Sequence, residues 1–159
     1  MNRLLLLRHA KSAGKDDPSL TDHERPLAPR GERACESMAE HLAGTEVDLV
    51  LCSTARRAAD TWDRVRAAVK AGEIRFEDEL YTFDGEDLID RLEALPGEVS
   101  SVMVVGHNPA IEELAEWLTG EGVEKYPTGA LATIALDRGW QDLEADCAEL
   151  RDFVRPRDL

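Results

Sequence analysis

Three short apolar segments of this sequence each lead directly into a group of basic side chains. The segments are largely aliphatic, as expected of strands buried on both faces of a parallel sheet, and they are Leu4–Leu7, Val47–Cys52 and Val102–Val105. The residues that follow them include Arg8 and His9, then Arg57, then His107. Ligands bind at the carboxyl ends of the strands in parallel sheets, so we expect these histidines and arginines to gather at one edge.

This combination of side chains is suited to phosphoryl transfer. An arginine guanidinium stays charged at any working pH and matches phosphate oxygens with two parallel N–H groups. The pKa of histidine is about 6.5, so a neutral imidazole is available as a nucleophile at neutral pH. We therefore expect one histidine to attack phosphorus while the other, with the arginines, stabilises the phosphoryl oxygens.

The third group of polar residues also marks the start of a helix. Asn108 is a suitable capping residue, and Pro109 is suited to the first helical position. The unpaired amides and the dipole of a helix N-terminus favour a nearby anion, so Asn108 is a further candidate for phosphate binding.

Other interpretations of the histidines are weaker. A single histidine after a strand is usually a structural residue, but two of them at strand ends, each with arginines nearby, favour a site. No acid or cysteine follows His9 or His107 at metal-ligand spacing, so we expect chemistry without a metal. His23, in a polar stretch, and His41, late in an amphipathic segment, are interpreted as surface residues.

Segments with a helical period separate the apolar runs. Their apolar stripes span Cys35–Leu42, Ala58–Val69, Leu88–Leu95 and Ile111–Leu118. Strands that alternate with helices predict an α/β domain with helices on both faces of the sheet. Leu131–Leu136 and Ala148–Val154 are predicted as further strands, and Ile74–Phe76 as a short one. Because no repeat or linker interrupts the pattern, we expect one domain over residues 1–159.

Composition narrows the class of protein. The chain has 159 residues and a formal net charge of -14, which argues against nucleic acid and anionic membranes as partners. The scattered cysteines argue against a disulfide framework and favour reduced thiols; they are Cys35, Cys52 and Cys147. The first apolar run is too short for a signal-peptide core or a membrane span. We therefore expect a cytoplasmic protein.

At these motifs the chain resembles the histidine phosphatase (phosphoglycerate mutase-like) superfamily, and within it the small SixA-type phosphohistidine phosphatases. The matching blocks occur in the family's order and are Leu6–Ser12, Arg25–Gly31, Ser53–Thr61, Gly106–Pro109, Thr128–Ala130 and Phe153–Arg157. The third block fits the pattern S-x-x-x-R-A-x-x-T, which places the family arginine on Arg57 rather than on Arg56.

The resemblance implies a fold and a set of roles. It implies a three-layer α/β/α sandwich with a mainly parallel central sheet, as in phosphoglycerate mutase-like proteins. It implies a phosphohistidine intermediate on His9, with Arg8, Arg57 and His107 completing the phosphate pocket. It also implies that the reaction needs no metal or organic cofactor.

The sequence leaves unassigned the identity of the general acid and the role of Arg25. Glu79 is the best positional match for the glutamate that larger relatives supply, but it has acidic neighbours at Glu77, Asp78 and Asp84. An imidazole leaving group, as in phosphohistidine, needs less protonation than an alkoxide. Arg25 either borders the pocket and contacts phosphate, which we favour slightly, or pairs with a loop acid such as Asp22.

The predicted function is hydrolysis of phosphohistidine, or of a small phosphoester, through the intermediate on His9. The expected partner is a phosphorylated protein or a small phosphorylated substrate. A phosphomutase of the same superfamily is an alternative, although the chain lacks room for the extra segment that encloses a mutase substrate. A non-catalytic phosphate-binding module is a second alternative, supported only by the unassigned general acid.

Overall fold

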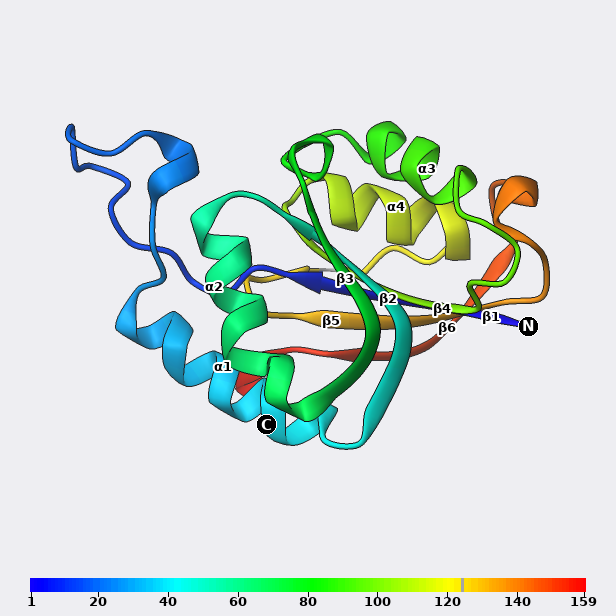
Figure 1. Ribbon diagram of the computed structural model, residues 1–159, viewed down its shortest axis with the longest axis horizontal. Helices are drawn as coiled ribbons and strands as arrows, with labels where there is room; N and C mark the ends of the chain where they lie inside the picture. Colours follow the sequence, from blue (N-terminus) through cyan, green and yellow to red (C-terminus); the bar gives the residue numbers. More distant parts are fainter. Residues whose placement is uncertain (124) are drawn as a thin grey trace.

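The computed structural model describes residues 1–123 and 125–159, and its central feature is a six-stranded sheet (Figure 1). The strands are β1 Asn2–Arg8, β2 Thr45–Ser53, β3 Val69–Glu77, β4 Ser101–Gly106, β5 Leu131–Leu136 and β6 Ala148–Val154. Their order across the sheet is β3-β2-β4-β1-β5-β6. The first four are parallel, whereas β5 runs antiparallel to β1 and to β6. The predicted mainly parallel sheet is confirmed.

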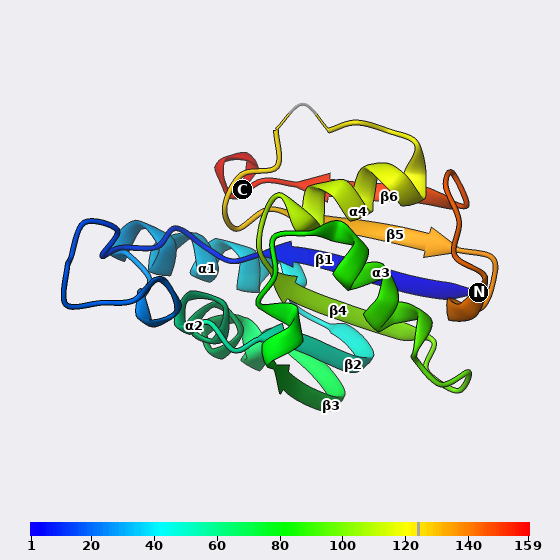
Figure 2. The same ribbon diagram turned by 90° about the horizontal axis from the view of Figure 1, so that it is seen from above.

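Helices cover both faces of this sheet, as the alternating pattern predicts. They are α1 Pro29–Leu42, α2 Arg56–Val65, α3 Gly85–Glu93 and α4 Ala110–Thr119. Figure 2 shows α3 and α4 together on one face, and α1 and α2 on the other. Successive residues of a strand point to opposite faces, so Leu4 and Leu6 pack beneath α3 and α4 while Leu5 and Leu7 pack beneath α1 and α2. The result is the predicted α/β/α sandwich.

Short 3-10 helices connect or follow the longer elements, and several of them border the carboxyl edge of the sheet. They are η1 Asp22–Glu24, η2 Arg66–Ala68, η3 Asp78–Leu80, η4 Trp140–Asp142 and η5 Pro156–Asp158. The three cysteines are buried and free. Among the residues that the structure describes, no helix has both the length and the apolar character that crossing a membrane requires.

Several predicted boundaries are wrong by a few residues. Val69 was expected in a helix, but α2 ends at Val65 and Val69 begins β3, which is longer than the predicted Ile74–Phe76. A β-branched side chain repeated at four-residue spacing fits either element, so periodicity alone could not place it. Pro109 precedes α4 instead of opening it. The helix ends at Thr119, and Gly120 caps it with a left-handed φ of 70°.

The segment that follows β1 packs directly on the start of α1. The backbone N–H of Ala28 donates to the carbonyl oxygen of Lys11 at 2.9 Å. Gly31 lies against the same carbonyl, and a Cβ added there would be 2.1 Å from its oxygen. The absence of a side chain at Gly31 therefore allows α1 to hold the residues next to His9.

We predict that Gly31→Ala destabilises the fold because the new methyl group overlaps the Lys11 backbone. Overpacking of this kind costs about 1–3 kcal/mol, and more when the obstacle is backbone. Urea unfolding of the variant measures the change in the free energy of unfolding. Gly97→Ala is the matched control, because a Cβ at Gly97 has no neighbour within 4 Å. Equal stability of the two variants would contradict this packing.

Candidate active site

The carboxyl ends of β1, β2 and β4 bring both histidines and two arginines to one edge of the sheet. β1 ends at Arg8 and pairs with the end of β4 at Gly106, and the N–H of His9 donates to the Gly106 carbonyl at 2.9 Å. The rings of His9 and His107 lie with their centroids 5.2 Å apart. The convergence that the sequence predicts is therefore present in the structure.

His9 is held in the tautomer that a nucleophile requires. Its Nδ1 lies 2.8 Å from the carbonyl oxygen of Ala10. A carbonyl can only accept, so Nδ1 carries the proton and Nε2 keeps its lone pair. Burial lowers the pKa of His9 to about 4, opposed by the bond to Ala10 and reinforced by the nearby charges of Arg57 and Arg8. The imidazole is therefore neutral at physiological pH.

His107 is buried beside it, with only one of its ring nitrogens paired. Nε2 lies 2.8 Å from the hydroxyl oxygen of Ser53, which also accepts the N–H of Ala55 at 3.1 Å. When the Ser53 hydroxyl donates to Nε2, the proton of the neutral ring resides on Nδ1. Burial, with smaller contributions from His9 and Arg57, lowers the pKa of His107 to about 3.

Two buried polar atoms at this edge have no hydrogen-bond partner. Among the described residues, Arg8 Nε and His107 Nδ1 are the buried side-chain nitrogens or oxygens left unsatisfied. Such atoms are rare in folded proteins because each one costs about 1–3 kcal/mol when it is desolvated without a partner. Both belong to residues that the sequence assigns to phosphate binding, and both nitrogens can donate to an oxyanion.

The structure distinguishes the two consecutive arginines of α2. Arg57 is 4% exposed, and its two terminal nitrogens donate to Asp22, at 2.7 Å to the carbonyl oxygen and 3.0 Å to Oδ2. Arg56 points to solvent and forms an exposed pair with Asp60 at 3.5 Å. Arg57, which the motif favours, is therefore the arginine at the site.

Thr61 explains why the arginine motif ends in a threonine. Its hydroxyl donates to the Arg57 carbonyl at 2.7 Å, one helical turn earlier, and accepts the N–H of Ala10 at 3.0 Å. One side chain thus fixes the helix that carries Arg57 against the residue after His9.

Asn108 and Arg8 share a backbone acceptor. Arg8 Nη1 and the Asn108 amide donate to the carbonyl oxygen of Tyr126, at 2.8 and 3.0 Å. The Asn108 side-chain carbonyl accepts the N–H of Glu112 at 3.2 Å, but the capping position of α4 is Pro109, so the expected cap at Asn108 is displaced by one residue. The polar atoms of Asn108 therefore have protein partners in this structure, and its contact with phosphate stays a prediction.

Arg25 adopts the second of the two roles considered for it. Its guanidinium donates to Asp22 at 3.0 Å, to Ser12 at 2.7 Å and to the Ala13 carbonyl at 3.2 Å. These contacts tie the loop after β1 to η1. The phosphate contact that we slightly favour for Arg25 stays a prediction, because it would require the guanidinium to exchange some of these loop contacts.

Glu79 lies away from the two histidines. Its side chain is 64% exposed, and its carboxylate is 3.4 Å from Arg91 Nε. Arg91 is bound more closely by Glu77, at 2.6 and 3.1 Å. Of the other acids considered, Asp78 accepts from Thr54 and Asp84 caps α3. No described contact brings Glu79 to His9 or His107.

Asp22 is the acid that does reach the site, although the sequence indicated it only as a partner for Arg25. Its carboxylate accepts from Arg57, from Arg25 and from the Tyr81 hydroxyl at 2.5 Å. The Tyr81 hydrogen bond, together with the two arginines, holds the pKa of Asp22 well below its usual range. Asp22 is therefore a carboxylate that occupies the Arg57 guanidinium.

Two aromatic residues that no sequence motif indicated, Tyr81 and Phe83, border His107. Tyr81 and Phe83 have ring centroids 5.4 and 5.6 Å from that of His107, and Phe83 is 48% exposed. His23 packs edge-on against Tyr81 at 4.9 Å and bonds to the Thr54 hydroxyl at 2.9 Å. The prediction that His23 is a plain surface residue is therefore wrong. His41 does lie at the surface, 3.6 Å from Asp152.

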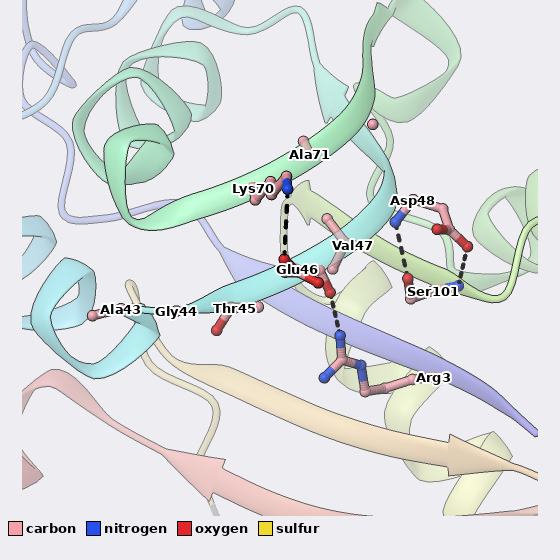
Figure 3. Close-up of a pocket in the computed structure, with 11 residues that line it drawn as sticks. Arg3, Ala43, Gly44, Thr45, Glu46, Val47, Asp48, Lys70, Ala71 and Ser101 are labelled. Carbon is pink, nitrogen blue, oxygen red and sulfur yellow. Dashed lines mark hydrogen bonds and ion pairs between the residues drawn. The ribbon is translucent and has the colours of Figure 1, made fainter.

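A hollow of about 700 Å³ lies at the opposite edge of the sheet, where the parallel strands begin (Figure 3). It is bordered by the starts of β2 and β3, far from the two histidines. Its charged groups contact one another: Lys70 is 3.8 Å from Glu46, and Arg3 donates to the Glu46 carbonyl. It offers none of the side chains that the proposed chemistry uses.

Comparison with known proteins identifies the family of the chain. The histidine phosphatase superfamily (branch 1) matches residues 4–87. An uncharacterized protein of Mycobacterium leprae is 37% identical over 166 residues, which cover 95% of this chain and 100% of that protein. A SixA-type protein of Nakamurella multipartitia has a TM-score of 0.83 and 29% identity, covering 98% of this chain and 96% of that one.

A second solved structure, the protein histidine phosphatase SixA complexed with tungstate, has a TM-score of 0.81 and 27% identity, covering 98% of both chains. The chain therefore belongs to the histidine phosphatase superfamily and has the fold of its SixA-type members. The predicted resemblance is confirmed, and membership supports a phosphatase activity.

We predict that the buried neutral histidines weaken the fold in mild acid. His9 takes up a proton below pH 6.5 when unfolded but only near pH 4 when folded, so the unfolded state binds more protons between these values. The free energy of unfolding then falls with falling pH, by on the order of 3 kcal/mol for His9 alone. Urea unfolding of wild type and His9→Asn across this range measures the effect. Parallel pH dependences would show that His9 has an ordinary pKa.

Proposed function

We propose that this protein is a phosphatase in which His9 forms a covalent phosphohistidine intermediate. The Nε2 lone pair of His9 attacks phosphorus and forms an N–P bond, while the bond to the leaving group breaks and its electron pair departs with that group. Water then attacks the same phosphorus, the His9 N–P bond breaks, and inorganic phosphate leaves. The observation that carries the proposal is the unprotonated Nε2 of His9 beside two unpaired buried donors.

Arg8, Arg57 and His107 would bind the phosphoryl oxygens. Arg8 Nε and His107 Nδ1 lack partners within the described protein, so an oxyanion between them would satisfy both. Arg57 would donate once its guanidinium exchanges Asp22 for the phosphoryl group. Preorganised donors of this kind stabilise charge that develops in the transition state without reorganisation. The step as written uses no metal ion.

Phosphohistidine in a protein is the substrate that the surroundings favour. An imidazole leaving group needs less protonation than an alkoxide, and Glu79 is turned toward Arg91. The exposed ring of Phe83, next to Tyr81 and His107, offers a flat apolar face to a planar leaving group. The relatives named SixA and the tungstate complex, a tetrahedral oxyanion on one of them, support the same substrate class.

We predict that phosphate is trapped on His9 during turnover. Incubation with a radiolabelled phosphohistidine peptide, followed by rapid quenching in alkaline detergent, should label wild type and leave His9→Ala unlabelled and inactive. His41→Ala is the matched control, because His41 is an exposed histidine outside the site. Full turnover by His9→Ala would overturn the proposed mechanism.

We also predict that the two arginines of α2 differ sharply in importance. Arg57→Ala should lower kcat/KM by roughly 100-fold or more, because it removes a buried charged donor from the transition state. Arg56→Ala should change it little, since Arg56 pairs only with Asp60 at the surface. Steady-state hydrolysis of the phosphohistidine peptide measures both. Similar losses in the two variants would argue against Arg57 as a phosphoryl ligand.

A further inference from the structure

A cationic pocket of about 320 Å³ lies beside the proposed active site and has no role in the mechanism above. Its basic lining residues come from four separate segments and are Lys11, Arg30, Lys125, Arg155 and Arg157. Among its lining residues in the described part of the chain there is no aspartate or glutamate. This concentration is unexpected, because the whole chain has only 19 lysines and arginines against 33 acids.

The charges of this cationic pocket are poorly neutralised by the protein. Arg155 pairs with Asp158 at 3.1 Å. Within the residues that the structure describes, the other four basic side chains have no ion pair. Elsewhere many arginines are paired, for example Arg64 with Glu32 at 3.3 Å and Arg138 with Glu144 at 2.8 Å. The pocket therefore keeps a local positive field on an acidic molecule.

The cationic pocket lies at the same edge of the sheet as His9. Lys11 follows His9 by two residues, and Arg155 follows the end of β6, which runs parallel to β1. Gly129, next to the lining residue Thr128, donates its N–H to the His9 carbonyl at 2.9 Å. Figure 2 shows the turn after β6 and the segment after β1 leaving the same end of the sheet.

The size and the lining of the pocket fit a segment of a partner protein better than a single small anion. Its basic groups come from four segments of the chain, and the remaining lining residues are mainly apolar or small: Ala34, Pro127, Thr128 and Pro156. The apolar residues of such a surface can contact the stem of an acidic side chain and its backbone, while the basic residues contact the carboxylates.

We propose that this cationic pocket binds an acidic segment of the phosphorylated protein, next to the phosphohistidine that enters the active site. This inference rests on the proposed function for the identity of its partner. A net charge of -14 would repel an acidic protein from most of the surface, whereas the pocket would attract it. Attraction at this one place would also orient the partner relative to the active site. Its contribution is sensitive to salt, since exposed charges are screened beyond about 8 Å at physiological ionic strength.

Two matched phosphohistidine peptides test the inference. One carries a run of glutamates beside the phosphohistidine, and the other carries glutamines at the same positions. The enzymes compared are wild type, the double variant Arg30→Glu/Arg157→Glu, and the control Arg66→Glu/Lys70→Glu. The control reverses two exposed basic residues outside the pocket and leaves its field intact.

At low salt, wild type should turn over the glutamate peptide with a kcat/KM roughly tenfold above that of the glutamine peptide. Arg30→Glu/Arg157→Glu should lose this preference while it hydrolyses the glutamine peptide at the wild-type rate. The control variant should keep the preference. No preference in wild type, or an unchanged preference in Arg30→Glu/Arg157→Glu, overturns the inference.

A binding measurement separates this inference from the proposed function. Fluorescence anisotropy with the unphosphorylated glutamate peptide reports on the pocket without any turnover. Salt-sensitive binding by wild type, lost in Arg30→Glu/Arg157→Glu and kept in the control, supports the pocket even if neither phosphopeptide is hydrolysed. Equal binding of the glutamate and glutamine peptides counts against the pocket while leaving the catalytic proposal untouched.

Discussion

Positive charge buried at the carboxyl edge of the sheet is the constraint on which this structure depends. Arg57 is almost fully buried, and a guanidinium cannot lose its proton to escape the cost of desolvation. It must therefore be neutralised by an anion, which in this structure is Asp22. The same charges help to keep His9 and His107 neutral, because a second and third cation in this space would be repelled. The proposed nucleophile and the proposed anion site thus depend on one electrostatic arrangement.

A small number of backbone contacts hold that arrangement in place. Thr61 links α2 to Ala10, and Gly31 lets α1 press on Lys11. The Tyr126 carbonyl holds Arg8, while the Tyr126 hydroxyl donates to the Leu6 carbonyl in β1. Each contact joins the polar edge to a buried strand or helix of the core. These contacts fix the side chains of the proposed site relative to the rigid sheet.

Local pattern was enough to predict the sheet, the helices and the convergence of two histidines and two arginines at one edge, because those signals lie within short stretches of sequence. Aliphatic runs defined the strands, and the residues directly after them defined the site. Val69 was misassigned because its spacing fits a helix as well as a strand. The role of Asp22 could not be predicted in the same way, because it depends on contacts with Arg57 and Tyr81, which lie 35 and 59 residues away along the chain.

Contacts between distant parts of the chain also explain why the sequence did not indicate Tyr81 and Phe83 and why Glu79 lies away from the histidines. Tyr81 and Phe83 reach His107 only through the packing of separate loops, which no single motif encodes. Glu79 was chosen by position along the chain, and its neighbour Arg91, from α3, attracts its carboxylate away from the histidines.

Asp22 has a consequence for how the enzyme would handle its product. If a phosphoryl group binds Arg57 as proposed, it must first displace a carboxylate that is tethered beside it. A tethered competitor acts at an effective concentration on the order of millimolar. When the bound phosphate begins to dissociate from Arg57, the Asp22 carboxylate would bind Arg57 again and so speed the release of phosphate. The Asp22 carboxylate would in this way reduce inhibition of the free enzyme by phosphate in the surrounding solution.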